Sequence, residues 1–210
     1  MKKTNIIIFL IIFLSFTLAF YFYSQMPDQM ASHWNTKGEV DDHMSKFWGL
    51  FLMPLISLGM FLIFIFIPKI DPLKNNIKKF RKYFDWFIVL IIAFLFYIYL
   101  LSIYWNLGYQ FNIGIMIIPA ISILFYFIGV ILKQSKRNWF IGIRTPWTLS
   151  SDIVWDKTHQ LGSKLFKTSA IIALIGIFFN QYALWFTVIP IIASALYLVI
   201  YSYLKYRKIK

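Results

Sequence analysis

Six apolar segments, each long enough to cross a lipid bilayer, constrain the fold of this chain more than any other feature. About 20 apolar residues in a helix span the hydrocarbon core, where only helices and closed barrels satisfy their own backbone hydrogen bonds. Asn180-Gln181 interrupts the last apolar stretch, which predicts two helices joined by a tight turn. The sequence therefore predicts an all-α fold, a polytopic bundle of six transmembrane helices over 5–23, 47–67, 86–105, 113–132 and the two halves of 165–204.

The composition excludes a soluble globular domain. Of the 210 residues, 60% are hydrophobic and only 14% are charged, whereas about a quarter of the residues in soluble domains are charged. The chain has no cysteine, so any metal site would need His, Asp or Glu ligands, and we expect no metal and no cofactor. Pumps and ion-driven permeases normally carry an ionisable side chain near the middle of the membrane, and the predicted spans show none there.

The distribution of positive charge predicts how the spans are oriented. All but two of the 21 lysines and arginines lie before the first span, between the second and third, between the fourth and fifth, or near the C-terminus; the exceptions are Lys37 and Lys46. The positive-inside rule then places both termini in the cytoplasm of a multi-pass plasma-membrane protein. The net charge of +13 is thus attributed to topology and to attraction for anionic lipid, and direct binding of nucleic acid is not expected.

The predicted outer loop, residues 26–46, is longer and more varied than a connection requires. Asn35, Gly38 and the pair Asp41-Asp42 are turn formers. The histidines and acids of the loop could hold a divalent cation or meet a cationic peptide, or the loop could be solvated and anchored by Trp34. We interpret it as a ligand-contact segment whose candidate residues are Pro27, Asp28, His33, Trp34, Asn35, Gly38, Glu39, Asp41, Asp42 and His43.

The predicted inner segment, residues 133–167, is basic, aromatic and amphipathic. Gly142 and Pro146 stop a helix, so its first half is predicted to be an interfacial loop. Ser150-Ser151-Asp152 has the pattern of a helix N-cap, and the helix that follows should bend into or continue as the fifth span.

Acidic, basic and imidazole side chains come together in this inner segment. Asp156 and His159 are three residues apart and share a helix face, and Arg144 could reach Asp152 or Asp156. The set could perform acid/base chemistry or form an ionic clamp that fixes the loop. We favour the clamp and assign no catalytic residue, because no nucleophile or second carboxylate accompanies the Asp–His pair.

Two stretches resemble a known family. The run 138–149, followed by Trp155 and 157–159, looks like the signature of the SdpI family of membrane immunity proteins. Met26-Pro27, 33–35, Gly38, Asp41 and Lys46 are similar to a small domain of unknown function that often precedes that signature. The resemblance implies a six-span protein that protects a cell from a secreted toxic peptide. It also implies a partner, a small cytoplasmic repressor that is drawn to the membrane when toxin is present.

The resemblance leads to a functional hypothesis and to a division of the chain. We expect an immunity and signal-transduction protein with an N-terminal membrane region over 1–110 and an SdpI-like region over 111–210. The alternatives are a membrane enzyme acting on lipid or peptide, with Arg144 holding a phosphate, and a small permease. The residues expected to dock a partner or form the clamp are Asn138, Trp139, Gly142, Arg144, Thr145, Pro146, Trp147, Asp152, Trp155, Asp156 and His159.

Overall fold

Six long helices make up most of the molecule. The structure is a computed structural model and describes residues 3–209. Each of the six is long and apolar enough to cross a membrane, which confirms the predicted all-α bundle. They are α1 (Lys3–Phe22), α2 (Lys46–Ile70), α4 (Arg81–Asn106), α5 (Ile113–Gln134), α7 (Asp152–Gly176) and α8 (Ala183–Arg207).

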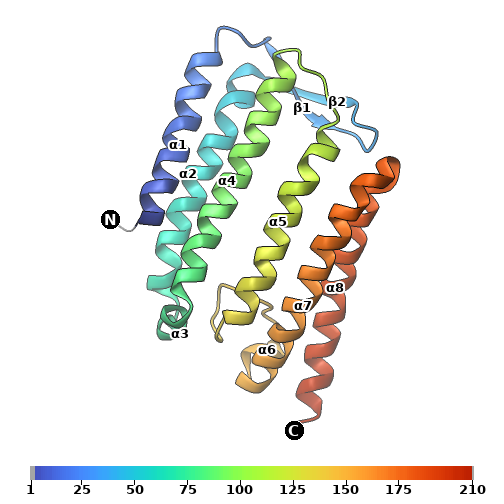
Figure 1. The fold of residues 1–210 in the computed structure, drawn as a ribbon. Helices are drawn as coiled ribbons and strands as arrows, with labels where there is room; N and C mark the ends of the chain where they lie inside the picture. Colours follow the sequence, from blue (N-terminus) through green and yellow to red (C-terminus); the bar gives the residue numbers. More distant parts are fainter. Residues whose placement is uncertain (1–2, 210) are drawn as a thin grey trace.

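The helices run roughly alongside one another, and the start of α1 and the end of α8 both lie away from the strands (Figure 1). In the first half of the chain α1, α2 and α4 pack together, and Ile8, Phe84 and Ile92 lie in their shared core. In the second half α7 packs against both α5 and α8. The described residues thus form a multi-pass membrane protein whose surface contacts the lipid bilayer.

The connection between the last two spans follows the prediction. The stretch that contains Asn180-Gln181 is a short 3-10 helix, Ile177–Tyr182, between α7 and α8. The hydroxyls of Ser169 and Ser194 form a 3.1 Å hydrogen bond between the two helices, a polar contact that suits close packing in lipid.

One part of the predicted outer loop is a β-hairpin. Strands β1 (Gln29–Trp34) and β2 (Val40–Ser45) pair in antiparallel orientation. The prediction that Asp41 and Asp42 form a turn was wrong, because both lie in β2. The turn lies between the strands, where the Asn35 side chain accepts hydrogen bonds from the backbone N–H groups of Lys37 and Glu39. Gly38 has φ +84°, a left-handed conformation that glycine adopts at low cost.

Two short helices lie at the opposite end of the bundle (Figure 1). They are α3 (Lys74–Lys79), which follows α2, and α6 (Pro146–Leu149), which precedes α7. Below, the end of the bundle with β1 and β2 is named the hairpin end. The end with α3, α6 and residues 135–145 is named the motif end.

Candidate functional site

The hairpin is fixed to the bundle by α4. The side chain of Asn106 makes two hydrogen bonds to the backbone of Ala31: its Oδ1 accepts from the N–H at 2.8 Å, and its Nδ2 donates to the carbonyl at 3.1 Å. The ring of Trp34 meets the ring of Trp105 edge to face, with centroids 5.6 Å apart. Met30 of β1 is fully buried in a core cluster with Leu50 of α2. These contacts hold β1 in a defined position, so the hairpin can present a fixed surface.

A cavity of about 500 Å³ lies between the hairpin and the neighbouring ends of α5 and α8. Asn112, which precedes α5, lines it and also caps that helix by accepting a hydrogen bond from the N–H of Ile115. The cavity is partly polar and partly apolar. Its lining includes His33, Trp34, Asn35 and Asp41 from the hairpin region, and Asn112, Ile115, Gln181 and Leu184 from the second half of the chain.

The predicted ligand-contact residues are mostly exposed and partly paired with one another. The Nδ1 atom of His33 contacts a carboxylate oxygen of Asp41. Asn35 donates to the carboxylate of Glu39 at 2.9 Å. Asp42 accepts from the backbone N–H of His43. The structure thus brings His33, Trp34, Asn35 and Asp41 to one cavity. Pro27 and Asp28 lie in exposed chain before β1.

Asp28 has a defined electrostatic partner. Its carboxylate lies 2.9 Å from the ammonium group of Lys46, at the start of α2. The hydrogen bond and the charge of Lys46 lower the pKa of Asp28 below its ordinary value. This contact joins the chain before β1 to the chain after β2. Among residues 3–209, no three His, Asp or Glu side chains lie close enough together to hold a metal ion.

At the motif end, Asn138 organises the loop that follows α5. Its side chain is fully buried. The Nδ2 group donates to the carbonyls of Lys136 and Ile141, and the Oδ1 atom accepts from the N–H groups of Phe140 and Ile141. Both ends of the amide are therefore satisfied inside the loop, which makes Asn138 a structural residue rather than a free contact group.

Two residues that the sequence analysis did not single out attach this loop to the first half of the chain. The buried carboxylate of Asp71 accepts from the N–H of Leu73 at 2.6 Å and from the N–H of Trp139 at 2.9 Å. The side chain of Asn76 donates to the carbonyl of Arg137. The only sequence signal was an acid directly after a span, in a segment that is otherwise basic.

His159 is buried and uses both ring nitrogens in hydrogen bonds to the backbone. Its Nε2 atom accepts from the N–H of Ile143 at 2.9 Å, which assigns the proton to Nδ1 and makes the ring neutral; Nδ1 then donates to the carbonyl of Trp155. The imidazole also stacks on the indole of Trp155, with ring centroids 4.0 Å apart. No ring nitrogen is left for acid/base chemistry, so His159 acts as a support for the loop.

Gly142 makes this support possible. Its φ is +117°, a conformation that side-chain-bearing residues rarely adopt. A Cβ atom placed on Gly142 would collide with Nε2 of His159. Gly142 is therefore required both by the backbone conformation and by the close approach of the imidazole.

The ion pairs of the motif end differ from those predicted. Arg144 was expected to reach Asp152 or Asp156, and this was wrong: its guanidinium donates to the carbonyl of Trp139. Asp152 pairs with Arg137 at 2.7 Å and Asp156 with Lys136 at 3.2 Å. The reason is the path of the chain, because the residues directly after α5 face the first turns of α7 while Arg144 turns back onto its own loop.

The last part of the motif docks α6 onto α8. Thr145 and Thr148 form a reciprocal capping box, and Pro146 occupies the first turn of α6, where its missing N–H has no cost. The hydroxyl of Thr145 bonds to that of Ser202 at 3.0 Å, and the ring of Trp147 packs on Tyr203. The predicted helix start at 150–152 is confirmed, because the side chain of Ser151 accepts a hydrogen bond from the N–H of Val154 and so caps α7.

Two family models match the chain. A domain of unknown function, DUF1648, matches residues 10–58, which include most of α1, the hairpin and the first half of α2. The SdpI/YfhL protein family matches residues 134–202, which include the motif-end loop, α6, α7 and most of α8. The predicted resemblance to the SdpI family is confirmed.

The SdpI-like chain is also similar to a curated protein over nearly its whole length. Immunity protein SdpI of Bacillus subtilis (strain 168) is 26% identical over 208 residues, which are 99% of this chain and 98% of that protein. The similarity therefore includes both the hairpin end and the motif end. No solved structure matches the chain.

Proposed function

We propose that this SdpI-like chain is a membrane immunity protein that gives resistance to a secreted toxic peptide. The observation that carries the proposal is the similarity over nearly the whole chain to a protein named as an immunity protein. The fixed hairpin with its adjacent cavity supplies a surface for the peptide, and the ordered loop at the other end supplies a surface for a cytoplasmic response.

The hairpin end is the outer end in this proposal. Among residues 3–209 it carries Lys37 and Lys46, whereas the other lysines and arginines of this range belong to the motif end or to helix segments near it. Cytoplasmic segments of membrane proteins carry the excess of positive charge. Both termini then lie in the cytoplasm.

Reporter fusions test this orientation. A reporter that is active only in the cytoplasm should be active when it is fused after residue 210 and inactive when it is inserted in the turn between Asn35 and Gly38. A reporter that is active only outside the membrane should give the reverse pattern. External activity of the fusion after residue 210 would contradict the proposed orientation.

The outer surface is suited to a cationic or amphipathic peptide. Glu39, Asp41 and Asp42 are exposed on the hairpin. The cavity beside them combines indole, aliphatic and amide surface. Acidic groups attract a cationic peptide toward the hairpin, and the cavity can accept one of its apolar side chains.

The inner surface is suited to a protein partner, and we propose that it docks a cytoplasmic repressor. Trp139 and Ile153 are about half exposed at the motif end, close to exposed Arg144 and Pro146. Aromatic residues and arginine are enriched where proteins bind one another. Asn138, Gly142 and His159 hold this surface in place. We therefore keep the clamp hypothesis, with the ion pairs Arg137–Asp152 and Lys136–Asp156 in place of those expected for Arg144. The proposed division near residue 110 falls in the connection after α4 and stays a prediction.

Expression of the chain in a sensitive bacterium tests the proposed function. Growth should continue at a higher concentration of at least one membrane-active peptide than in cells with an empty vector. The protein must be shown in the membrane fraction by an epitope tag, so that a failure of insertion is recognised. Unchanged tolerance across a broad panel of cationic and apolar peptides, with the protein inserted, would contradict the proposal.

A further inference from the structure

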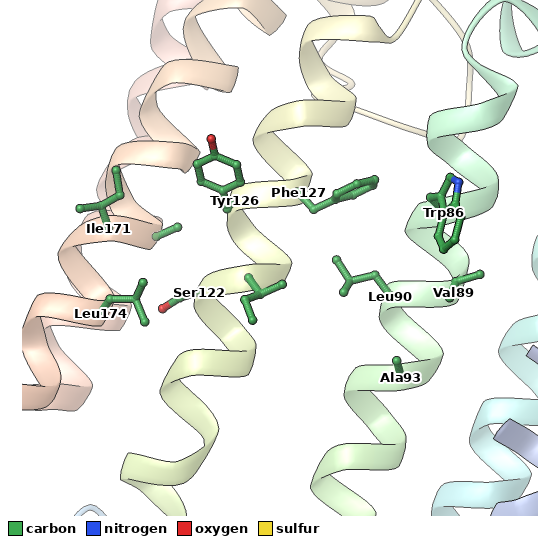
Figure 2. A pocket seen from close by; sticks show the side chains of 11 residues that line it. Trp86, Val89, Leu90, Ala93, Ser122, Tyr126, Phe127, Ile171 and Leu174 are labelled. Carbon is green, nitrogen blue, oxygen red and sulfur yellow. The ribbon is translucent and has the colours of Figure 1, made fainter. Parts of the chain in front are cut away.

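An apolar groove opens on the side of the bundle between α4, α5 and α7 (Figure 2). Its volume is about 390 Å³. Leu90 and Ala93 of α4 face Ile171 and Leu174 of α7 across it, and α5 lies between them. Several lining side chains, such as Ile171, are about half exposed at the surface of the bundle. Because this surface lies along membrane-spanning helices, the groove opens toward lipid and not toward water.

Amphipathic and basic side chains surround the end of the groove that is nearer the motif end. Trp86 lies near the start of α4, and Tyr126 lies two turns before the end of α5; both line the groove. Tryptophan and tyrosine favour the level of the lipid headgroups. The Nζ atom of Lys167 lies 5.5 Å from the centre of the Tyr126 ring. The mouth of the groove is therefore aromatic and positively charged.

Two more lysines lie on the same helix faces. Lys82 is one turn before Trp86 on α4, and Lys133 is two turns after Tyr126 on α5, so each shares a face with a residue that lines the groove. Both are exposed. Within residues 3–209, no ion pair involves Lys133 or Lys167. Three lysines thus lie around the mouth of an apolar groove, and two of them, Lys133 and Lys167, have no carboxylate partner in the described part of the chain.

A polar atom inside the groove also lacks a partner. Ser122 lines the groove from α5, one turn farther from the motif end than Tyr126, and is almost fully buried. Its hydroxyl has no hydrogen-bond partner in the described part of the chain. A buried hydroxyl without a partner is unfavourable, because it has lost its hydrogen bonds to water and gained none in the protein. A ligand with an ester carbonyl just below its charged group would satisfy it.

We propose that the groove binds an anionic phospholipid from the membrane leaflet at the motif end. One acyl chain occupies the apolar groove, the hydroxyl of Ser122 donates to an ester carbonyl, and the lysines around the mouth bind the phosphate. A phospholipid has an acyl chain, an ester carbonyl and a phosphate in sequence, and the groove offers an apolar wall, a hydroxyl and lysines in the same sequence. The bound lipid would also fill the space between the two halves of the bundle, where α4 packs against α5.

Native mass spectrometry of the full chain in mild detergent tests this proposal. Phosphatidylglycerol and phosphatidylcholine with identical acyl chains are added separately, and the retained lipid is counted. The unmodified protein should retain one phosphatidylglycerol more strongly than phosphatidylcholine. Lys167→Gln should reduce that preference about five-fold, since a basic residue near anionic lipid contributes about 1 kcal/mol.

Filling the groove tests the acyl-chain part separately. Ala93→Phe should remove the retained lipid, whereas Ala195→Phe on the exposed face of α8 is a matched control and should not. Should Ala93→Phe fail to give a monodisperse protein, Leu90→Trp takes its place. Equal retention in the groove-filled variant and the control, or an unchanged lipid preference in Lys167→Gln, would overturn the proposal. Equally strong binding of soluble glycerol phosphate that is insensitive to Ala93→Phe would show a free-phosphate site and overturn it as well.

Discussion

Replacing Gly142 by alanine is expected to lower the midpoint of thermal unfolding by about 4–24 °C, at 2–4 °C per kcal/mol for a chain of this size. A side chain at φ +117° adds strain, which typically amounts to about 1–3 kcal/mol. The new Cβ atom also collides with the imidazole of His159, and forcing extra atoms into a packed site costs about 1–3 kcal/mol more. The measurement is intrinsic fluorescence of the purified protein on heating.

Gly59→Ala is the matched control for this prediction. Gly59 lies within α2, and a Cβ atom added there would meet nothing within 4 Å. In a helix alanine is about 1 kcal/mol more favourable than glycine, so the control should be as stable as the unmodified protein or slightly more stable. Equal midpoints for Gly142→Ala and Gly59→Ala would show that the loop does not need the conformation described for Gly142.

Replacing Asp71 by alanine is expected to lower the free energy of unfolding by about 3 kcal/mol or more, since each hydrogen bond to a charged group contributes about 1.5–3 kcal/mol. Its buried carboxylate accepts from the N–H groups of Leu73 and Trp139, and the substitution removes both acceptors. Asp71→Asn should lose less, because one amide oxygen remains to accept a hydrogen bond. The measurement is again the midpoint of thermal unfolding in detergent.

Limited proteolysis separates a local effect from general destabilisation. Without Asp71, the loop around Trp139 should be cut while the spans remain protected. Asp152→Asn is the comparison, because Asp152 is exposed and its ion pair with Arg137 should contribute less than about 1 kcal/mol. An Asp71→Ala protein as stable and as resistant as Asp152→Asn would contradict the assigned role of Asp71.

The helices of the bundle could be predicted from the sequence because their signals are local. An apolar segment of sufficient length has few alternatives in lipid, and the cap at Ser151 is a short-range pattern that the structure confirms. The hairpin escaped prediction because its strands are short and lack a regular alternation of apolar and polar residues. β1 also depends on a distant partner, since Asn106 binds Ala31 across 75 positions of the chain.

The candidate site was also predicted only in part, because local patterns could be read from the sequence and contacts between distant residues could not. Gly142 was selected because it stops a helix, Trp155 through the family resemblance and His159 through its spacing from Asp156, and the structure brings the three together. The ion-pair partners of Asp152 and Asp156 were not predicted correctly, because several cations of the inner segment are at comparable separations in the sequence. Only the folded path of the loop decides that Lys136 and Arg137 reach the acids. Asp71 is 68 positions from Trp139, a separation at which no sequence pattern indicates a contact.

The growth tolerance of two charge-matched double variants tests the proposed immunity function most directly. Asp41→Asn with Asp42→Asn removes two negative charges from the exposed hairpin, and Asp152→Asn with Asp156→Asn removes two from the motif end. If the hairpin meets a cationic peptide outside the cell, the first variant should lose tolerance several-fold, and more at low salt because salt screens exposed charges. The second variant should keep the tolerance of the unmodified protein when both are inserted in the membrane in equal amounts. Equal tolerance in the two variants, or loss confined to the motif-end pair, would contradict recognition of the toxin by the hairpin.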